Sequence, residues 1–191
     1  MTTTLSRETQ FDWETLAESN DASTRESVYE DDFGNEAREF VQSAQNLLKK
    51  ELHVVTADAK KSADAFWSLN ESMRQEGGKE NQGYFGTRVR IVGGGTLEAT
   101  WYINTFYDGD KKTQGKKNVR SEYLKKGQGD KYPKHAFKTA KDWEREAIEE
   151  VEGRYALLRQ RAGVLSKLRR NLAEYERLLD KCYSQDEGEQ E

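Results

Sequence analysis

Apolar side chains recur at steps of three and four residues between about Asn35 and Gln75. The series is Phe40, Val41, Ala44, Leu47, Leu48, Leu52, Val55, Ala59, Ala63, Phe66, Trp67 and Met73. This spacing predicts one amphipathic helix, and the glycines at 77 and 78 are expected to end it. The β-branched run near His53 to Thr56 is where we expect a break, if a helix of this length has one.

A second stripe of the same period runs from about Thr139 to Tyr183. Its members are Trp143, Ala147, Ile148, Val151, Tyr155, Leu158, Ala162, Leu165, Leu168, Leu172, Tyr175 and Leu179. It predicts a second long helix, with Asp142 and Glu144 near the N-terminus, where the helix dipole favours acids. Such a stripe forms either an intramolecular core or the seam of a homodimer, and both remain open.

The pattern between the two helices changes to alternation, which is typical of strands. Residues 84–91 and 96–107 are rich in β-branched and aromatic residues and are separated by three glycines, so they predict a β-hairpin. Residues 119–124 add a short third strand. Alternation places Arg88, Arg90 and Tyr102 on the polar face of the hairpin. The expected fold class is α+β, with two long antiparallel helices flanking a small antiparallel hairpin or three-stranded sheet.

Composition indicates a thin core and suggests a division of the chain. Only 34% of the 191 residues are hydrophobic and 35% are charged, which favours an elongated helical protein. Residues 1–34 are polar and acidic and are expected to form a mostly disordered arm. Residues 35–183 are expected to form a single helix–sheet–helix domain with a basic loop at 108–138, and residues 184–191 are expected to form an acidic tail.

Charge is segregated along the chain, although the formal net charge is only −4. Residues 84–138 contain twelve bases and five acids, a net of +7. Residues 1–36 contain two bases and ten acids, a net of −8. Such asymmetry points to a polyanionic partner more strongly than the total charge does.

Counting residues excludes most catalytic centres. The two histidines, His53 and His135, belong to no metal-binding motif, and the lone Cys182 cannot build a thiolate zinc site. The glycines at 93–95 are not followed by the Lys-Ser/Thr pair of a phosphate-binding loop. We therefore expect no enzyme activity, no metal and no cofactor. No stretch approaches about 18 apolar residues, and the N-terminus lacks an apolar signal segment, so a cytoplasmic protein without membrane contact is expected.

The basic segment is interpreted as a nucleic-acid-binding site. Lysine and arginine release counterions from phosphates, while arginine and tyrosine on a strand face can contact grooves or stack on bases. The candidate residues are Arg88, Arg90, Tyr102, Lys111, Lys112, Lys116, Lys117, Arg120, Lys125, Lys126, Lys131 and Lys134. Two other interpretations remain: the bases bind the acidic arm or a partner protein, or they keep a solvated loop soluble.

Three stretches carry a resemblance to a known family. RVRIVGGGTLEATWYINTF at 88–106, YLKKGQGDKYPKHAF at 123–137 and WEREAIEEVEGRYALLRQR at 143–161 resemble the MobI-type conjugative transfer proteins of mobilisable plasmids and integrative elements. The resemblance covers about half of the chain. It implies an auxiliary mobilisation factor that binds double-stranded DNA at the origin of transfer and assists a separate relaxase, and it implies no catalytic residues.

A second hypothesis belongs to a different class of protein. The long helices would act as a coiled-coil adaptor or regulator that recruits a protein partner, without specific binding to DNA.

Overall fold

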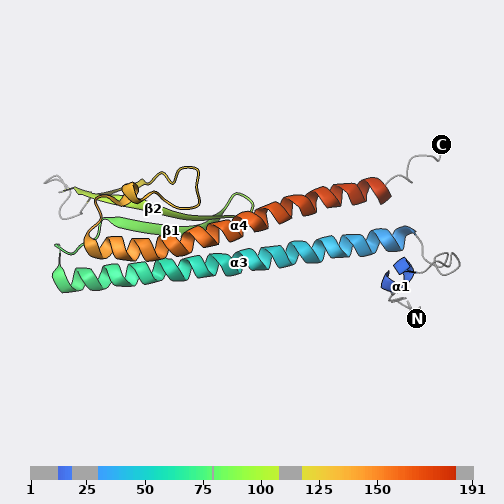
Figure 1. Ribbon diagram of the computed structural model, residues 1–191, viewed down its shortest axis with the longest axis horizontal. Helices are drawn as coiled ribbons and strands as arrows, with labels where there is room; N and C mark the ends of the chain where they lie inside the picture. The colour runs from blue at the N-terminus through green and yellow to red at the C-terminus, as the bar shows by residue number, and fades with distance from the viewer. Residues whose placement is uncertain (1–12, 19–29, 79, 108–117, 184–191) are drawn as a thin grey trace, which may run out of the picture. The chain divides into compact units, whose positions relative to one another are not determined.

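The computed structural model describes residues 13–18, 30–78, 80–107 and 118–183 of the chain (Figure 1). In chain order, this described part contains α1 (Trp13–Glu18), α3 (Glu30–Gly77), β1 (Phe85–Val92), β2 (Thr96–Tyr107), β3 (Asn118–Tyr123), the short 3-10 helix η1 (Lys134–Phe137) and α4 (Asp142–Tyr183). Two long helices and a three-stranded sheet thus make up an α+β fold, as the sequence predicts.

The chain divides into two compact units. The sheet unit, residues 44–173, contains the sheet, η1 and the adjoining parts of α3 and α4. The second unit contains the described residues before Ala44 and after Ala173. In it, Phe40 meets Tyr175 edge to face with ring centroids 6.1 Å apart. The single domain expected for residues 35–183 stays a prediction.

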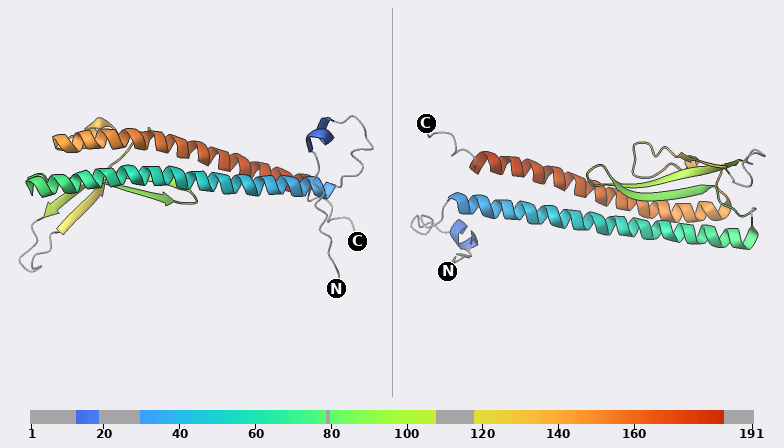
Figure 2. Two further views of the ribbon diagram at one scale, coloured as in Figure 1. Left: turned by 90° about the horizontal axis from the view of Figure 1, so that it is seen from below. Right: turned by 180° about the vertical axis from the view of Figure 1, so that it is seen from behind.

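The two long helices run antiparallel within the sheet unit. Arg154 of α4 pairs with Asp58 of α3, and Arg161, seven residues further along α4, pairs with Glu51 at 2.6 Å. Residue numbers rise along one helix as they fall along the other, which confirms the predicted antiparallel arrangement. Figure 2 shows these parts of α3 and α4 side by side with the sheet against them.

Helix α3 continues through the β-branched run without a break, so a break at His53 to Thr56 is not found. The reason is packing: Val55 is completely buried and Thr56 is 6% exposed. The Thr56 hydroxyl also donates a hydrogen bond of 2.8 Å to the carbonyl of Leu52, one turn earlier in the helix. Burial of this face outweighs the small helix propensity cost of β-branched residues.

Part of the predicted acidic arm is helical. Residues 13–18 form α1, and α3 begins at Glu30, five residues before the predicted start at Asn35. Asp32 lies in the first turn of α3, and carboxylates are favoured at a helix N-terminus. The rest of the arm and the acidic tail lie outside the described residues.

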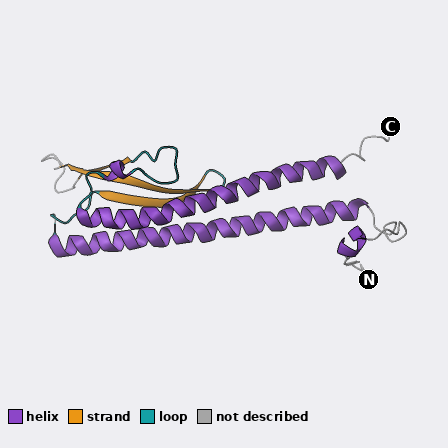
Figure 3. Cartoon of the chain, in the orientation of Figure 1, coloured by secondary structure: helices purple, strands orange, loops and turns teal. Residues whose placement is uncertain are grey.

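The sheet is antiparallel with the strand order β1-β2-β3 (Figure 3). Its hairpin register pairs Phe85 with Ile103 and Val92 with Thr96, so the three glycines form the turn as predicted. All three have positive φ, +43°, +71° and +106° along the turn, a region that side chains with a Cβ rarely adopt. The third strand also forms, at residues 118–123.

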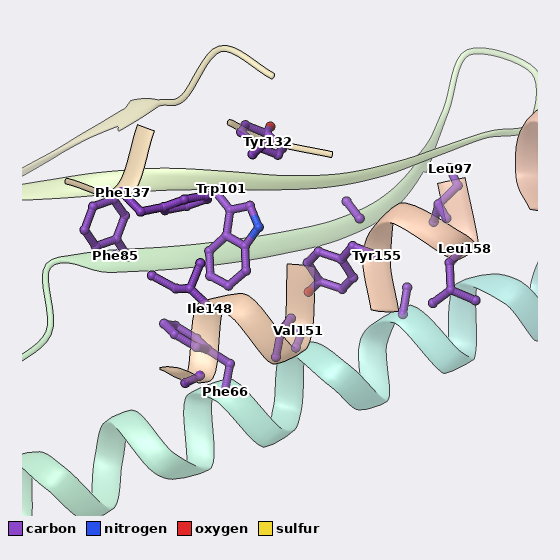
Figure 4. Packing of buried hydrophobic residues seen from close by; sticks show 14 of the residues in the cluster. Phe66, Phe85, Leu97, Trp101, Tyr132, Phe137, Ile148, Val151, Tyr155 and Leu158 are labelled. Carbon is purple, nitrogen blue, oxygen red and sulfur yellow. The ribbon is translucent and has the colours of Figure 1, made fainter. Parts of the chain in front are cut away.

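The core of the sheet unit lies between the inner face of the sheet and the two helices (Figure 4). Trp101 of β2 is at its centre and is completely buried. Its ring contacts Phe66 of α3, Phe137 of η1 and Tyr155 of α4, with centroid separations of 5.1, 5.6 and 5.8 Å. One indole therefore joins all the layers of this unit.

A buried carboxylate of α4 fixes the segment that precedes η1. Glu152 is 2% exposed, and its oxygens accept hydrogen bonds from the Trp101 indole at 2.7 Å and the Tyr132 backbone N–H at 2.8 Å. Arg159 donates to both oxygens, at 2.8 and 3.1 Å. The guanidinium also donates to the carbonyls of Ala99 and Asp130. This network ties residues 130–132 to both β2 and α4.

A second buried carboxylate, Glu144, anchors the start of β1. It is fully buried and accepts backbone hydrogen bonds from Tyr84 at 2.7 Å and Phe85 at 2.9 Å. Its other oxygen accepts the N–H of Lys141 at 3.2 Å, which caps the N-terminus of α4. The same side chain therefore begins a helix and fixes a strand.

Candidate nucleic-acid interface

The outer face of the sheet, turned away from the helices, carries the predicted strand residues. Residues directly opposite one another in an antiparallel pair share a face. Arg88 is opposite Thr100, Arg90 is opposite Glu98, and Tyr102 lies between Gly86 and Tyr123. The outer face thus brings Arg88, Arg90 and Tyr102 together, as strand alternation predicts.

Two tyrosines form an aromatic pair on this face. The rings of Tyr102 and Tyr123 meet edge to face with centroids 5.7 Å apart. Tyr102 lies over Gly86, where an added Cβ would stand 2.4 Å from its ring. Burial raises the pKa of the Tyr102 phenol above its ordinary value. The absence of a side chain at Gly86 leaves the space that the Tyr102 ring occupies.

The two arginines of the outer face differ in their partners. Arg88 is exposed and donates a 3.2 Å hydrogen bond to the Tyr123 hydroxyl. Arg90 forms an ion pair with Glu98 across the hairpin, and this hydrogen bond raises the pKa of Arg90. The charge of Arg90 is therefore offset by a neighbour, whereas Arg88 presents its charge together with two aromatic rings. Strand alternation treats Arg88 and Arg90 alike, but the structure gives them different partners.

Arg120 lies on the other face of the sheet. Its strand partner is Thr105, which alternates with Asn104 and so shares a face with Ile103 and Trp101. The structure therefore does not bring Arg120 together with Arg88. Side chains alternate between the two faces along a strand, and the register of β3 against β2 decides that Arg120 is on the opposite face from Arg88.

The lysines that follow β3 lie along the edge of β2 where β3 ends. The Leu124 N–H donates to the Trp101 carbonyl at 2.9 Å, and Arg159 joins the carbonyls of Ala99 and Asp130. These hydrogen bonds hold the segment that follows β3 against β2. The segment carries four of the candidate bases, all at least partly exposed: Lys125, Lys126, Lys131 and Lys134. Lys126 is turned back onto the Gly129 carbonyl.

A cavity of about 270 Å³ lies between this segment and α4. Its floor is apolar and includes Phe137 and Ile148. Its rim carries four bases: Lys131, Lys134, Lys138 and Arg145. Lys134 forms an exposed ion pair with Glu149 at 3.2 Å, which is worth little in water. The remaining candidates, Lys111, Lys112, Lys116 and Lys117, lie outside the described residues.

The helices supply a second group of bases, which is not among the site residues predicted from the sequence. Residues 159–173 of α4 contain five bases and no acid, and this run was the available signal. Arg169 and Arg170 of that run line a groove at the hairpin turn with Lys49 and His53 of α3. Their meeting depends on helix packing and could not be predicted from spacing.

Two findings apply to the described ranges alone. Within them, no group of three or more His, Cys, Asp or Glu side chains is placed to hold a metal ion. None of the helices in these ranges has the length and apolar character needed to cross a membrane.

Comparison with known proteins gives one finding. The family model described as MobI protein matches residues 55–173, which is more than half of the chain and lies within the sheet unit. No curated protein and no solved structure matches the chain. The chain belongs to the MobI family, and this membership implies a role in conjugative mobilisation.

Proposed function

We propose that this protein is a non-enzymatic accessory factor of conjugative transfer that binds double-stranded DNA at the origin of transfer and assists a separate relaxase. The observation that supports the proposal most is the cluster of exposed Arg88 and Tyr123 with half-buried Tyr102 on the outer face of the sheet. None of these side chains is needed in the core, and the family of the chain acts in mobilisation. The protein would act in the cytoplasm.

The outer face and its neighbouring lysines suit different parts of a duplex. A sheet face with arginine and tyrosine can enter a groove and contact base edges, as other strand-based DNA readers do. Lysines such as Lys125 and Lys131 would neutralise phosphates and release counterions. Under this proposal the lysines supply affinity and the strand residues supply whatever sequence preference exists.

The decisive experiment compares binding to an origin-of-transfer duplex with binding to a length-matched random duplex. Fluorescence anisotropy of the full chain would be measured between about 50 and 200 mM salt. We expect tighter binding to the origin that persists at the higher salt. Equal affinity for both duplexes, or none, would refute the proposed DNA recognition.

A variant of the outer face tests the site itself. Arg88→Gln should weaken origin binding about tenfold, equivalent to about 1.4 kcal/mol, and should reduce the preference over random DNA. The matched control is Lys60→Gln, which removes one exposed charge from α3, a helix that does not form the outer face. An equal loss in both variants would show that only net charge matters.

The adaptor hypothesis keeps support from one observation. Leu157, Val164 and Leu168 of α4 are 56%, 55% and 47% exposed, and their spacing of seven and four residues places them on one helix face. This apolar stripe is suited to a relaxase, another transfer protein or a second copy of the chain. Light scattering of the purified protein would reveal a homodimer, and Leu157→Glu with Val164→Glu should dissociate it.

A further inference from the structure

A groove of about 850 Å³ lies at the turn of the hairpin, within the sheet unit. It is bounded by α3, by the glycines at 93–95 and by α4. The turn is fixed there because Arg169 of α4 donates to the carbonyl of Gly95 at 3.2 Å. The right-hand view of Figure 2 shows the turn beside α4, in agreement with this hydrogen bond.

The charged and titratable side chains that line this groove are all basic in type. They are Lys49 and His53 from α3 and Arg169 and Arg170 from α4, and no carboxylate belongs to the lining. A hollow elsewhere between the same helices is different, because it is lined by Asp58 and Glu150 as well as by bases. The groove is therefore a local concentration of positive charge in a chain whose net charge is negative.

Two of the bases that line the groove, Lys49 and Arg170, are available to a ligand. Within the described ranges, neither Lys49 nor Arg170 forms a hydrogen bond or an ion pair, and both are exposed. The nearby Arg161 shows the contrast, since its guanidinium is paired with Glu51. Unpaired bases around one hollow repel each other, and an anion in the groove would relieve that repulsion.

The triglycine turn leaves one wall of the groove without side chains. An added Cβ at Gly93 or Gly94 would meet no atom within 4 Å. The positive φ values already require glycine here, and a consequence is that a ligand can approach the backbone closely. Guanidinium groups opposite such a wall suit phosphate, which they bind in a bidentate manner.

We propose that this groove binds backbone phosphates of DNA and forms a second contact beside the outer face of the sheet. This inference rests on the proposed DNA-binding function and deepens it. Strand β1 joins the two contacts, since it carries Arg88 and Arg90 on the outer face and leads directly into the turn. The groove reads no bases, so it contributes affinity in a manner independent of sequence.

The test uses the full chain with Lys49→Gln and Arg170→Gln combined. Loss of two phosphate contacts should lower the slope of log K against log salt by about two, equally for origin and random duplexes. Arg88→Gln should instead reduce the origin preference. The control is Lys60→Gln with Lys61→Gln, which removes two exposed charges from the same helix α3 without touching the groove.

The outcomes separate the groove from the proposed function. A slope that falls in the groove variant and not in the control supports the groove, provided that circular dichroism shows unchanged helix content. If the groove variant and the control behave alike while Arg88→Gln loses origin preference, the groove proposal is wrong and the function stands. If the unmodified protein binds neither duplex, both are refuted.

Discussion

Changing Glu152 to glutamine should destabilise the sheet unit by about 3 to 5 kcal/mol, the usual cost of removing one partner of a buried ion pair. The carboxylate is 2% exposed and the Arg159 side chain is 8% exposed. The two carboxylate oxygens of Glu152 accept hydrogen bonds from Trp101, Tyr132 and Arg159. The side-chain amide of glutamine would place its N–H groups against one of these donors. It would also leave the guanidinium of Arg159 without its carboxylate counterion.

The matched control is an exposed ion pair between α3 and α4. Arg161 and Glu51 are 48% and 42% exposed, so Arg161→Gln should cost less than about 1 kcal/mol. Equilibrium urea denaturation followed by circular dichroism gives both values from the shift in midpoint at constant m-value. High salt should remove the small contribution of the exposed pair and leave that of Glu152 nearly unchanged.

The Glu152→Gln variant should also weaken DNA binding. Residues 130–132 are held to α4 through the Tyr132 N–H on Glu152 and the Asp130 carbonyl on Arg159, and Lys131 lies between them. If this segment is loosened in the variant, each binding event must also offset the conformational entropy that is lost when the segment becomes ordered. A Glu152→Gln cost below about 1 kcal/mol, equal to that of the exposed pair, would refute the reasoning that burial makes this network stabilising.

Three further predictions concern the sheet and the core. Gly86→Ala should cost about 1 to 2 kcal/mol in thermal or urea unfolding, because its Cβ would stand 2.4 Å from the Tyr102 ring and overpacking displaces the ring; an unchanged midpoint would contradict this. Glu98→Gln frees Arg90 from its ion pair and should steepen the salt dependence of DNA binding by about one unit of slope, and a slope equal to that of the unmodified protein would count against Arg90 as a contact. Burial raises the pKa of Tyr155 to about 12 from about 10 in the unfolded chain. The contribution of Tyr155 to the free energy of unfolding is therefore complete below about pH 10 and is lost as the pH rises through about 12. Tyr155→Phe should therefore remove up to about 3 kcal/mol of alkaline destabilisation from the pH profile of unfolding, and identical profiles would show that Tyr155 does not titrate in this way.

The sequence by itself determined the element order and the fold class. The steps of three and four in the two apolar stripes predict both helices, and three glycines between alternating runs predict the hairpin. These features depend on local periodicity, which a single chain displays directly. The same alternation was sufficient to place Arg88, Arg90 and Tyr102 on one face.

Tertiary structure decided which charges remain available and where they meet. The cross-strand ion pair with Glu98 distinguishes Arg90 from Arg88, and the register of β3 moves Arg120 to the opposite face. The groove joins Lys49 to Arg170 across more than a hundred residues of sequence. Pairing and proximity depend on register and helix packing, and neither quantity is written in the spacing of residues along the chain.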